Sequence, residues 1–301
     1  MSTQQTERKA VVEVLFAASC WGCIGLFTRY LSGIGMSSIA ITFFRSLAAA
    51  AMLAVYLGVR SRATFRIRGR DLWMFVGTGF ISIGLFNAFY FMTQTLTTLS
   101  VAAVLLYTAP FFVIVMSRLF FKERITRQKV AALVLAFVGC LFVTGLVGGG
   151  AVSLAPVAIV TGLASAVCYA LYSIFGRVAL NRYQPMTVTF YSLFVAACSM
   201  GILFAATGAE MPPVSGGMVL GICGLGFFST ALPYVFYTSG LAKLSPSKAS
   251  VLAFAEPMVA TLLGIFVLHE PITVPALIGI ALIFAGIVVL NRRSHHKGRG
   301  L

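Results

Sequence analysis

Two charged residues lie deep inside apolar stretches of this 301-residue chain. Arg45 is the only charged residue from Ser37 to Val59, and Glu256 interrupts a second apolar stretch that ends near Leu268. In a membrane-spanning helix, each charge would lie roughly 12 to 14 Å from the nearer end, because the rise is about 1.5 Å per residue. The hydrocarbon core is roughly 30 Å thick, so both positions are predicted near mid-depth.

A charge at that depth needs an explanation, because it costs roughly 2.5–3.5 kcal/mol on insertion scales and usually marks function. Glu256 could be a protonatable or solute-facing carboxylate, and Arg45 could balance its charge or bind an anionic group of a solute. The structural alternative is that Arg45 donates to backbone carbonyls while Glu256 accepts a hydrogen bond beside Pro257. Both interpretations are open from the sequence.

Aromatic and amide side chains in the apolar stretches are candidates for the lining of a solute cavity. Such groups recognise amphipathic or aromatic solutes by stacking and by hydrogen bonds. The alternative is ordinary helix packing, or anchoring at the membrane surface, where Trp and Tyr are enriched. Besides Arg45 and Glu256, the predicted substrate-binding residues are Trp21, Asn87, Tyr90, Tyr107, Tyr169, Tyr191, Tyr234 and Tyr237.

Three prolines fall in the middle of apolar stretches, at Pro110, Pro233 and Pro257. Proline removes a backbone hydrogen bond and kinks a helix, and the freed carbonyls are tolerated only beside protein or a water-filled cavity. These positions are predicted to form a hinge or a cavity wall, and the alternative is a static kink that shapes packing.

The composition requires an integral membrane protein. Of the residues, 59% are hydrophobic and 10% are charged, whereas soluble domains carry roughly 25% charged residues. Each span needs roughly 20 apolar residues, so the chain accommodates about ten spans and no soluble domain. The fold class is therefore all-α and membrane-embedded. Spans are predicted at 11–31, 37–59, 72–94, 99–120, 128–146, 154–178, 187–206, 217–239, 247–268 and 274–290.

Most of the Lys and Arg residues that give the net charge of +15 lie in the connections between the apolar stretches and are not gathered on one surface. A nucleic-acid-binding module would concentrate its cations on one face, whereas here every second connection is basic, which is typical of membrane orientation. Both termini are therefore predicted on the cytoplasmic side. The basic segments contain Arg8 and Lys9; Arg60, Arg62, Arg66, Arg68 and Arg70; Lys122, Arg124, Arg127 and Lys129; Arg177 and Arg182; Lys243 and Lys248; and Arg292, Arg293, Lys297 and Arg299.

The two halves of the chain resemble each other, because Met74–Val143 aligns with Gly221–Leu290. A unit of five helices ends on the opposite side of the membrane from its start, so the second copy must be inverted. Inverted repeats are common in secondary transporters, with the solute site between the halves near mid-membrane. The predicted units are residues 11–147 and 154–290, with short cytoplasmic tails at 1–10 and 291–301. Matching positions include Gly79/Gly226, Tyr90/Tyr237, Pro110/Pro257, Glu123/Glu270, Thr126/Thr273 and Gly139/Gly286.

Glu123 and Glu270 lie near predicted helix ends, where placing a charge costs little free energy, so they are interpreted as structural. Thr126 and Thr273 are the predicted N-caps of the helices that follow them. Arg45 and Glu256, in contrast, have no charged counterpart in the other half and break the internal symmetry.

Several short motifs follow one another in a characteristic order. They are Trp21-Gly22, Arg45, Tyr107-Thr108-Ala109-Pro110 with Glu123-Arg124-Ile125-Thr126, and Ala255-Glu256-Pro257 with His269-Glu270-Pro271. Together they resemble the EamA family of the drug/metabolite transporter superfamily over essentially the whole chain. The resemblance implies a ten-helix bundle with a central cavity, no ATP-binding domain and, in many bacterial members, export of amino acids, other metabolites or drugs. Cys168-Tyr169-Ala170 departs from the pattern, since related chains often carry tryptophan there.

We therefore expect a secondary transporter that exports a small organic solute by alternating access through a central cavity. The direction rests on the resemblance alone, and proton coupling rests on Glu256. Facilitated diffusion or uptake by the same fold is the nearer alternative, and a non-transporting scaffold or receptor is the alternative from another class.

An enzyme is not expected. Intramembrane catalysis usually needs a histidine, paired acids or a metal cluster, and the three histidines are His269 near the outer face and His295 and His296 in the tail. An ATP-driven pump would need a phosphate-binding G-x-x-x-x-G-K-[S/T] loop, which this sequence does not contain. No catalytic residue, metal or cofactor is predicted. The expected partners are the solute, the bilayer of a bacterial plasma membrane and protons, without nucleic acid, and no oligomeric state is indicated.

Overall fold

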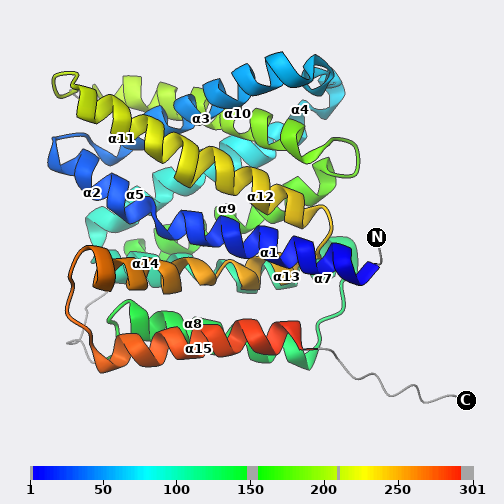
Figure 1. The fold of residues 1–301 in the computed structure, drawn as a ribbon, viewed down its shortest axis with the longest axis vertical. Coiled ribbons are helices and arrows are strands. Elements are labelled where there is room, and N and C mark those ends of the chain that lie inside the picture. Colours follow the sequence, from blue (N-terminus) through cyan, green and yellow to red (C-terminus); the bar gives the residue numbers. More distant parts are fainter. Residues whose placement is uncertain (1–2, 148–154, 209–210, 293–301) are drawn as a thin grey trace, which may run out of the picture.

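The computed structural model describes residues 3–147, 155–208 and 211–292, and within these ranges the regular elements are all helical. The elements are α1 (Thr3–Gly22), α2 (Ile24–Gly33), α3 (Ser38–Arg60), η1 (Arg62–Phe65), η2 (Gly69–Asp71), α4 (Leu72–Phe75), η3 (Val76–Leu85), α5 (Phe86–Leu96), α6 (Leu99–Leu106), α7 (Ala109–Phe121), α8 (Arg127–Val143), α9 (Pro156–Ala179), α10 (Pro185–Thr207), α11 (Gly216–Gly226), η4 (Phe227–Ala231), α12 (Leu232–Leu241), α13 (Pro246–Leu252), α14 (Ala255–Val267) and α15 (Val274–Asn291). The long helices lie side by side, from α3, α10 and α11 at the top of Figure 1 to the α8 and α15 pair at its base.

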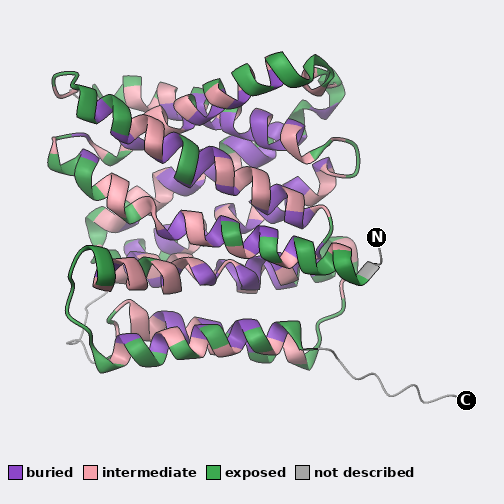
Figure 2. Cartoon of the chain, in the orientation of Figure 1, coloured by how far each residue is buried: buried purple, intermediate pink, exposed green. Residues whose placement is uncertain are grey.

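Nine helical stretches of the described chain are long and apolar enough to cross a membrane. Buried residues line the contacts between these helices, and exposed residues lie on their outer faces (Figure 2). The predicted fifth span corresponds to α8, whose 17 residues are at the lower limit of roughly 17–25 for a spanning helix. The total of ten spans therefore stays a prediction.

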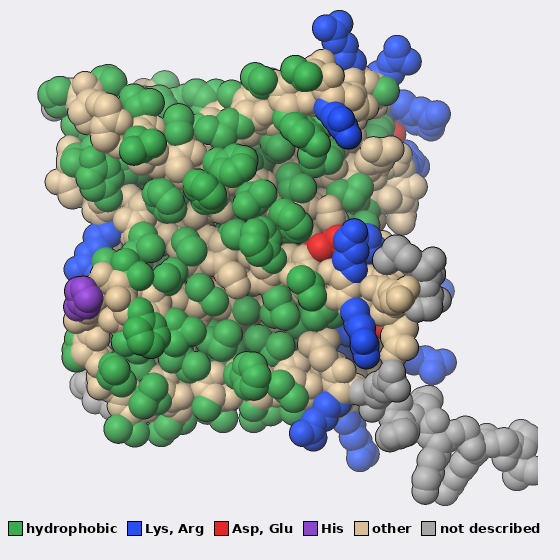
Figure 3. All heavy atoms as spheres, viewed as in Figure 1, with side chains coloured by type: hydrophobic (Ala, Val, Ile, Leu, Met, Phe, Trp, Pro, Cys, Tyr) green, Lys and Arg blue, Asp and Glu red, His purple; other side chains and the backbone are tan. Residues whose placement is uncertain are grey.

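Lys and Arg gather at the end of the helical stack where α1 begins and α15 ends, and an apolar surface separates this end from the other (Figure 3). We call it the basic end. It contains the connections Arg60–Arg70, Lys122–Lys129 and Lys243–Lys248. The other end, called the opposite end below, contains the connections after α2, α5 and α14.

Several predicted spans are interrupted helices. The first breaks at Cys23, between α1 and α2, which the sequence did not indicate. Two others break just before their prolines: Pro110 is the second residue of α7 and Pro257 the third of α14. Pro233 differs, because α12 continues η4 directly and the proline lies inside the unbroken helical stretch Gly216–Leu241. Proline in a first turn removes no helical hydrogen bond, because those amides lack a partner there.

Two segments, η3 and η4, are π-helical and precede α5 and α12. In each, a hydroxyl donates to the carbonyl five residues earlier: Ser82 Oγ to Gly77 O at 2.8 Å, and Thr230 Oγ1 to Leu225 O at 3.0 Å. The π-helix is rare and frequently found at functional sites. Both segments lead directly into helices that line the cavity described below.

The α8 and α15 pair is held by a contact between backbones. A Cβ atom on Gly139 would lie 2.7 Å from Gly279 O, and one on Gly279 would lie 2.6 Å from Gly139 O. Small residues let membrane helices approach this closely. The contact explains why the two helices form a tight layer of their own (Figure 1).

The predicted N-terminal tail, residues 1–10, is helical from Thr3 onward, because α1 begins there and runs into the first predicted span. Polar residues at that end are tolerated in the helix because Glu7 and Glu13 pair with lysines across helices.

The predicted N-caps are confirmed, since Thr126 accepts from the Lys129 amide and Thr273 from the Ala276 amide. Some predicted positions lie outside the described residues: the 147/154 unit boundary around Gly148, and Arg293, His295, His296, Lys297 and Arg299.

Candidate functional site

A cavity lies between the helices where the α6–α7 and α13–α14 breaks meet α1, α3, α9 and α12. Its open volume is about 80 Å³, below the roughly 300 Å³ of a pocket for a small organic ligand. Side chains must therefore move before such a solute fits. The lining residues are Trp21, Ile24, Arg45, Phe86, Leu106, Tyr107, Ala109, Pro110, Tyr169, Tyr234, Ser250, Ala253, Phe254 and Glu256.

Arg45 enters this cavity from α3 with much of its donor capacity unused. Its Nη2 donates to Asn87 Oδ1 at 3.4 Å, and Asn87 is itself held by donation from Nδ2 to Ile83 O at 2.7 Å. The buried Arg45 Nε has no hydrogen-bond partner among the described residues. An arginine has five N–H donors, so this guanidinium can bind a further acceptor in the cavity.

Glu256 lies in the first turn of α14, directly after the chain break, and its amide donates to Ala253 O at 3.0 Å. Its carboxylate makes no hydrogen bond or ion pair within the described part of the chain, and so does not pair directly with Arg45. The α14 backbone approaches α1 closely here, since a Cβ atom on Gly22 would lie 2.9 Å from Glu256 O. The cavity therefore contains a guanidinium group and a carboxyl group that are not bonded to each other.

Aromatic rings form most of the remaining wall. The Trp21 and Tyr234 rings are 5.5 Å apart at their centroids, and Phe86 and Tyr169 are 5.3 Å apart. Both pairs are edge-on, an arrangement that aromatic rings prefer. A solute with an apolar or aromatic part would contact ring faces and edges here.

Most of the predicted substrate-binding residues meet at this cavity. Six of the ten line it directly, and Tyr237 lines a small adjoining cavity, where its hydroxyl is 2.7 Å from Ser173 Oγ. Asn87 accepts a hydrogen bond from Arg45, and the ring of Tyr90 packs against Phe86, which lines the cavity. The six are Trp21, Arg45, Tyr107, Tyr169, Tyr234 and Glu256.

Tyr191 does not belong to this group. Its hydroxyl donates to Phe65 O at 2.7 Å, and its ring packs against Phe75 near the basic end. Sequence reasoning also missed Phe86, Phe254 and Ser250 in the cavity wall. Phe254 could have been found from the sequence, because it lies two residues before Glu256.

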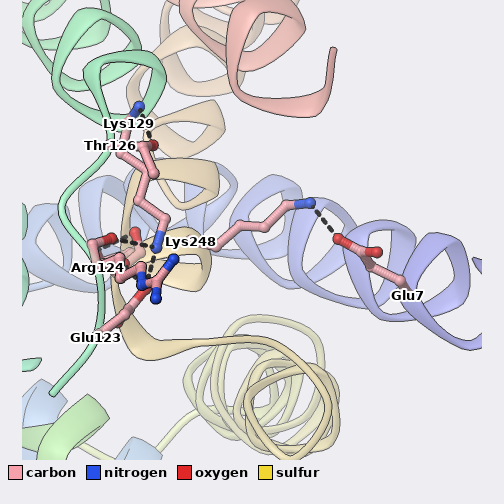
Figure 4. Close-up of polar contacts among 8 residues, drawn as sticks. Glu7, Glu123, Arg124, Thr126, Lys129 and Lys248 are labelled. Atoms are coloured by element: carbon pink, nitrogen blue, oxygen red, sulfur yellow. Dashed lines mark hydrogen bonds and ion pairs between the residues drawn. The ribbon is translucent and has the colours of Figure 1, made fainter. Parts of the chain in front are cut away.

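A cluster of ion pairs closes the basic end around the Lys243–Lys248 connection. Lys243 Nζ donates to both Glu13 carboxylate oxygens, at 2.8 and 2.9 Å, and Lys248 Nζ donates to Glu7 Oε1 at 2.8 Å. Figure 4 shows Lys248 reaching across to Glu7 on α1. The α12–α13 connection, through Lys243, and the first turn of α13, through Lys248, are thereby tied to α1.

Glu123 is the third acid of this cluster. Its Oε1 accepts from Ser247 Oγ and from Lys129 Nζ, so the α7–α8 connection is tied to the start of α13 (Figure 4). Burial acts to raise the pKa of Glu123, but the hydrogen bonds from Lys129, Ser245 and Ser247 and the charge of Lys129 outweigh it, so the pKa is lowered. Glu123 is therefore ionised and paired at neutral pH. We call the Glu7, Glu13 and Glu123 contacts the basic-end clamp.

The opposite end has no comparable clamp among the described residues. Within the described part of this end, Glu270 pairs with Arg29 at 3.4 Å, and the two side chains are 54% and 67% exposed. Leu99 at the start of α6 is 65% exposed, whereas Pro246 at the start of α13 is buried. Among the described residues, the basic end therefore has more ion pairs between helices than the opposite end, and these are less exposed.

The sequence profile of the EamA-like transporter family matches the chain twice, over residues 8–145 and 156–292. An uncharacterized transporter of Archaeoglobus fulgidus is 28% identical over 291 residues, covering 95% of this chain and 99% of the relative. The uncharacterized inner membrane transporter YicL of Salmonella typhimurium is 24% identical over 298 residues, covering 97% and 98%. Together with the nine apolar helical stretches of the described residues, these matches make the chain a multi-pass membrane protein.

A more specific name belongs to a probable terminal-alkyne amino-acid exporter of Streptantibioticus cattleyicolor, which is 26% identical over 299 residues, covering 97% of this chain and 96% of the relative. A crystal structure with 21% identity superposes with a TM-score of 0.82 over 94% of this chain and 96% of that one, which shows the shared fold.

Proposed function

The chain belongs to the EamA-like transporter family, and on this premise we propose that it is a secondary transporter that exports a small organic solute carrying both polar and apolar groups. The observation that carries the proposal is the central cavity, where Arg45 and Glu256 present opposite charges that do not pair with each other among aromatic rings. An amino acid or a related amphipathic molecule offers matching charges and an apolar body. The amino-acid exporter among the relatives supports this solute class.

The proposed mechanism is alternating access between two inverted five-helix units, at residues 11–147 and 154–290, with both termini cytoplasmic. The double family match supports the duplication. The predominance of Lys and Arg at one end supports the orientation, since cytoplasmic loops carry an excess of these residues. The basic-end clamp, compared with a single exposed ion pair at the opposite end among the described residues, supports a state closed toward the cytoplasm. Export then requires the clamp to open so that the solute enters from the cytoplasm.

Proton coupling through Glu256 is the second part of the proposal. A carboxylate that reaches the cavity without a partner can exchange a proton when the cavity is open to one side or the other. Intramembrane carboxylates of this kind form proton relays in pumps and transporters. Facilitated diffusion is the alternative in which flux does not depend on a pH gradient.

Purified protein in liposomes tests both parts, with labelled amino acids, nucleosides and cationic drugs assayed with and without a pH gradient. We expect Arg45→Gln to reduce flux of the transported solute about 10- to 100-fold, because a hydrogen bond to a charged group contributes about 1.5–3 kcal/mol. Glu256→Gln should abolish the response to the pH gradient. Glu270→Gln, which removes an exposed pair, is the matched control and should retain both properties.

Normal flux and normal pH response in Arg45→Gln and Glu256→Gln would contradict the proposed site. A wild-type flux that ignores the pH gradient would instead leave facilitated diffusion. No flux of any solute in the panel would favour a scaffold or receptor.

A further inference from the structure

A second and larger hollow lies at the basic end, outside the central cavity. Its volume is about 700 Å³, compared with about 80 Å³ for the central cavity. It separates the start of α1 and Lys248 from the start of α8 and the end of α15. We call it the basic groove, and its lining residues are Gln4, Glu7, Arg8, Val11, Val12, Thr126, Gln128, Lys129, Lys248, Leu290, Asn291 and Arg292.

The charges in the basic groove are predominantly positive. Four cations line it and a single carboxylate, that of Glu7, which is already bound to Lys248 at 2.8 Å. Lys129 is paired with Glu123. Arg8 and Arg292 are exposed and have no ion-pair partner among the described residues. The groove therefore holds two guanidinium groups free to bind an anion, with two ammonium groups adding to the positive potential.

The floor of the groove is formed by α8 and α15, which amide side chains hold in place. Gln128 spans the two helices, because its Nε2 donates to Val289 O at 2.7 Å and to Arg292 O at 2.7 Å. This bridge fixes the end of α15 beside the start of α8, so the wall that carries Arg292 has a defined position. On this side, the groove is therefore bounded by α8 and α15, which Gln128 joins.

One wall of the groove is apolar. Val11 and Val12 of α1 and Leu290 of α15 line it, and Val12 is 64% exposed. These residues lie at the ends of predicted spans, where the hydrocarbon of the bilayer meets its headgroups. A ligand that fits the groove therefore carries an anionic head and an apolar portion that continues along the helices.

We propose that the basic groove binds the headgroup of one anionic phospholipid from the membrane leaflet at the basic end. The phosphate accepts hydrogen bonds from Arg8 and Arg292, and the start of an acyl chain lies along Val11, Val12 and Leu290. Basic pockets between spanning helices recognise anionic headgroups in this way, and guanidinium groups suit phosphate because they bind it through two parallel bonds. A soluble anion matches the charge of the groove but not its apolar wall.

The site also adjoins the basic-end clamp, since Glu7 and Lys248 belong to both. A bound phosphate is a second anion within reach of Lys248. Occupancy of the groove therefore bears on the contact that ties α13 to α1. The lipid at this site is positioned to influence the closure of the basic end, whatever solute the central cavity carries.

The test uses the full-length protein purified in a neutral detergent, with thermal unfolding and native mass spectrometry as readouts. Dioleoylphosphatidylglycerol, dioleoylphosphatidylcholine and inorganic phosphate are added separately at equal concentration. We expect the anionic lipid to raise the unfolding temperature and to remain bound as one copy. The neutral lipid and inorganic phosphate should each produce less than half of that rise.

Arg8→Gln combined with Arg292→Gln should lose at least half of the rise and the retained lipid, and Arg8→Gln alone should lose part of it. The matched control, Arg60→Gln combined with Arg66→Gln, removes two exposed cations at the same end but outside the groove, and should behave as wild type. All four positions are exposed, so each variant should fold. An equal loss in the control, an equal rise with the neutral lipid, or a full rise with inorganic phosphate would each overturn the proposal.

Discussion

Replacing Glu123 tests the basic-end clamp most directly. Glu123→Gln keeps the size of the side chain and its ability to accept from Ser247, but removes the charge paired with Lys129. The pair is largely buried, since the Glu123 and Lys129 side chains are 13% and 19% exposed. Loss of a hydrogen bond between charged groups costs about 1.5–3 kcal/mol. If the closed basic end loses this free energy of about 1.5–3 kcal/mol, the ratio of open to closed molecules rises by about 12- to 140-fold.

A cysteine in the cavity wall can report this shift. Ser250→Cys is introduced into a chain whose six native cysteines are replaced, because Ser250 lies on α13 and faces the central cavity. An impermeant maleimide applied on the side of the basic end labels this position only when that end opens. We expect the labelling rate to rise in proportion to the open fraction in Glu123→Gln.

The matched control is Glu270→Gln at the opposite end. Its pair with Arg29 is exposed on both sides, and exposed pairs contribute about 0–1 kcal/mol. It should leave labelling from the basic end within about fivefold of wild type, by the same free-energy conversion. The reasoning is refuted when Glu123→Gln and Glu270→Gln label at the same rate, or when wild type is already labelled rapidly from the basic end.

Two further predictions concern packing and pH. Gly139→Ala places a methyl group 2.7 Å from Gly279 O and should lower the free energy of unfolding in detergent by about 1–3 kcal/mol. The control is Gly58→Ala, whose methyl group meets no atom within 4 Å and should not lower this free energy. The pKa of Glu123 is lowered in the folded protein. The stabilisation that ionised Glu123 gives to the closed basic end is therefore complete above the ordinary glutamate pKa of about 4.3, and it is lost as the pH falls through the lower pKa of the folded protein. The distance between spin labels on α13 and the α7–α8 connection should therefore stay constant from neutral pH to about pH 5 and increase only below about pH 4; an increase already at pH 6 to 7 would contradict the assignment.

The sequence located the centre of the site well because charge is rare inside apolar stretches. Arg45 and Glu256 stand out for that reason, and both line the cavity. Aromatic residues were harder to place, as Tyr191 shows. A helix that is apolar all round has no polar face to indicate its orientation, so nothing distinguished the side of α10 that faces Phe65 and Phe75 from the side that faces the bundle interior.

The clamp could not be predicted, because its partners are distant in sequence. Glu13 and Lys243 are separated by 230 positions, and Glu7 and Lys248 by 241. From the sequence, these lysines indicate orientation only. Their pairing depends on α1 lying beside the start of α13, which is a consequence of packing. The break at Cys23 was likewise hidden, since no proline marks it.

The π-helical segment η4 gives the span that ends in α12 a spare residue. A π turn holds one residue more than an α turn, and successive residues of an α-helix are about 100° apart around its axis. Closing this turn to α geometry would rotate α12 by about that angle and carry Tyr234 away from the cavity. Such a rotation about the axis of α12 would change which of its residues faces the cavity, so the π turn is a place where this span could change its exposed face without unfolding.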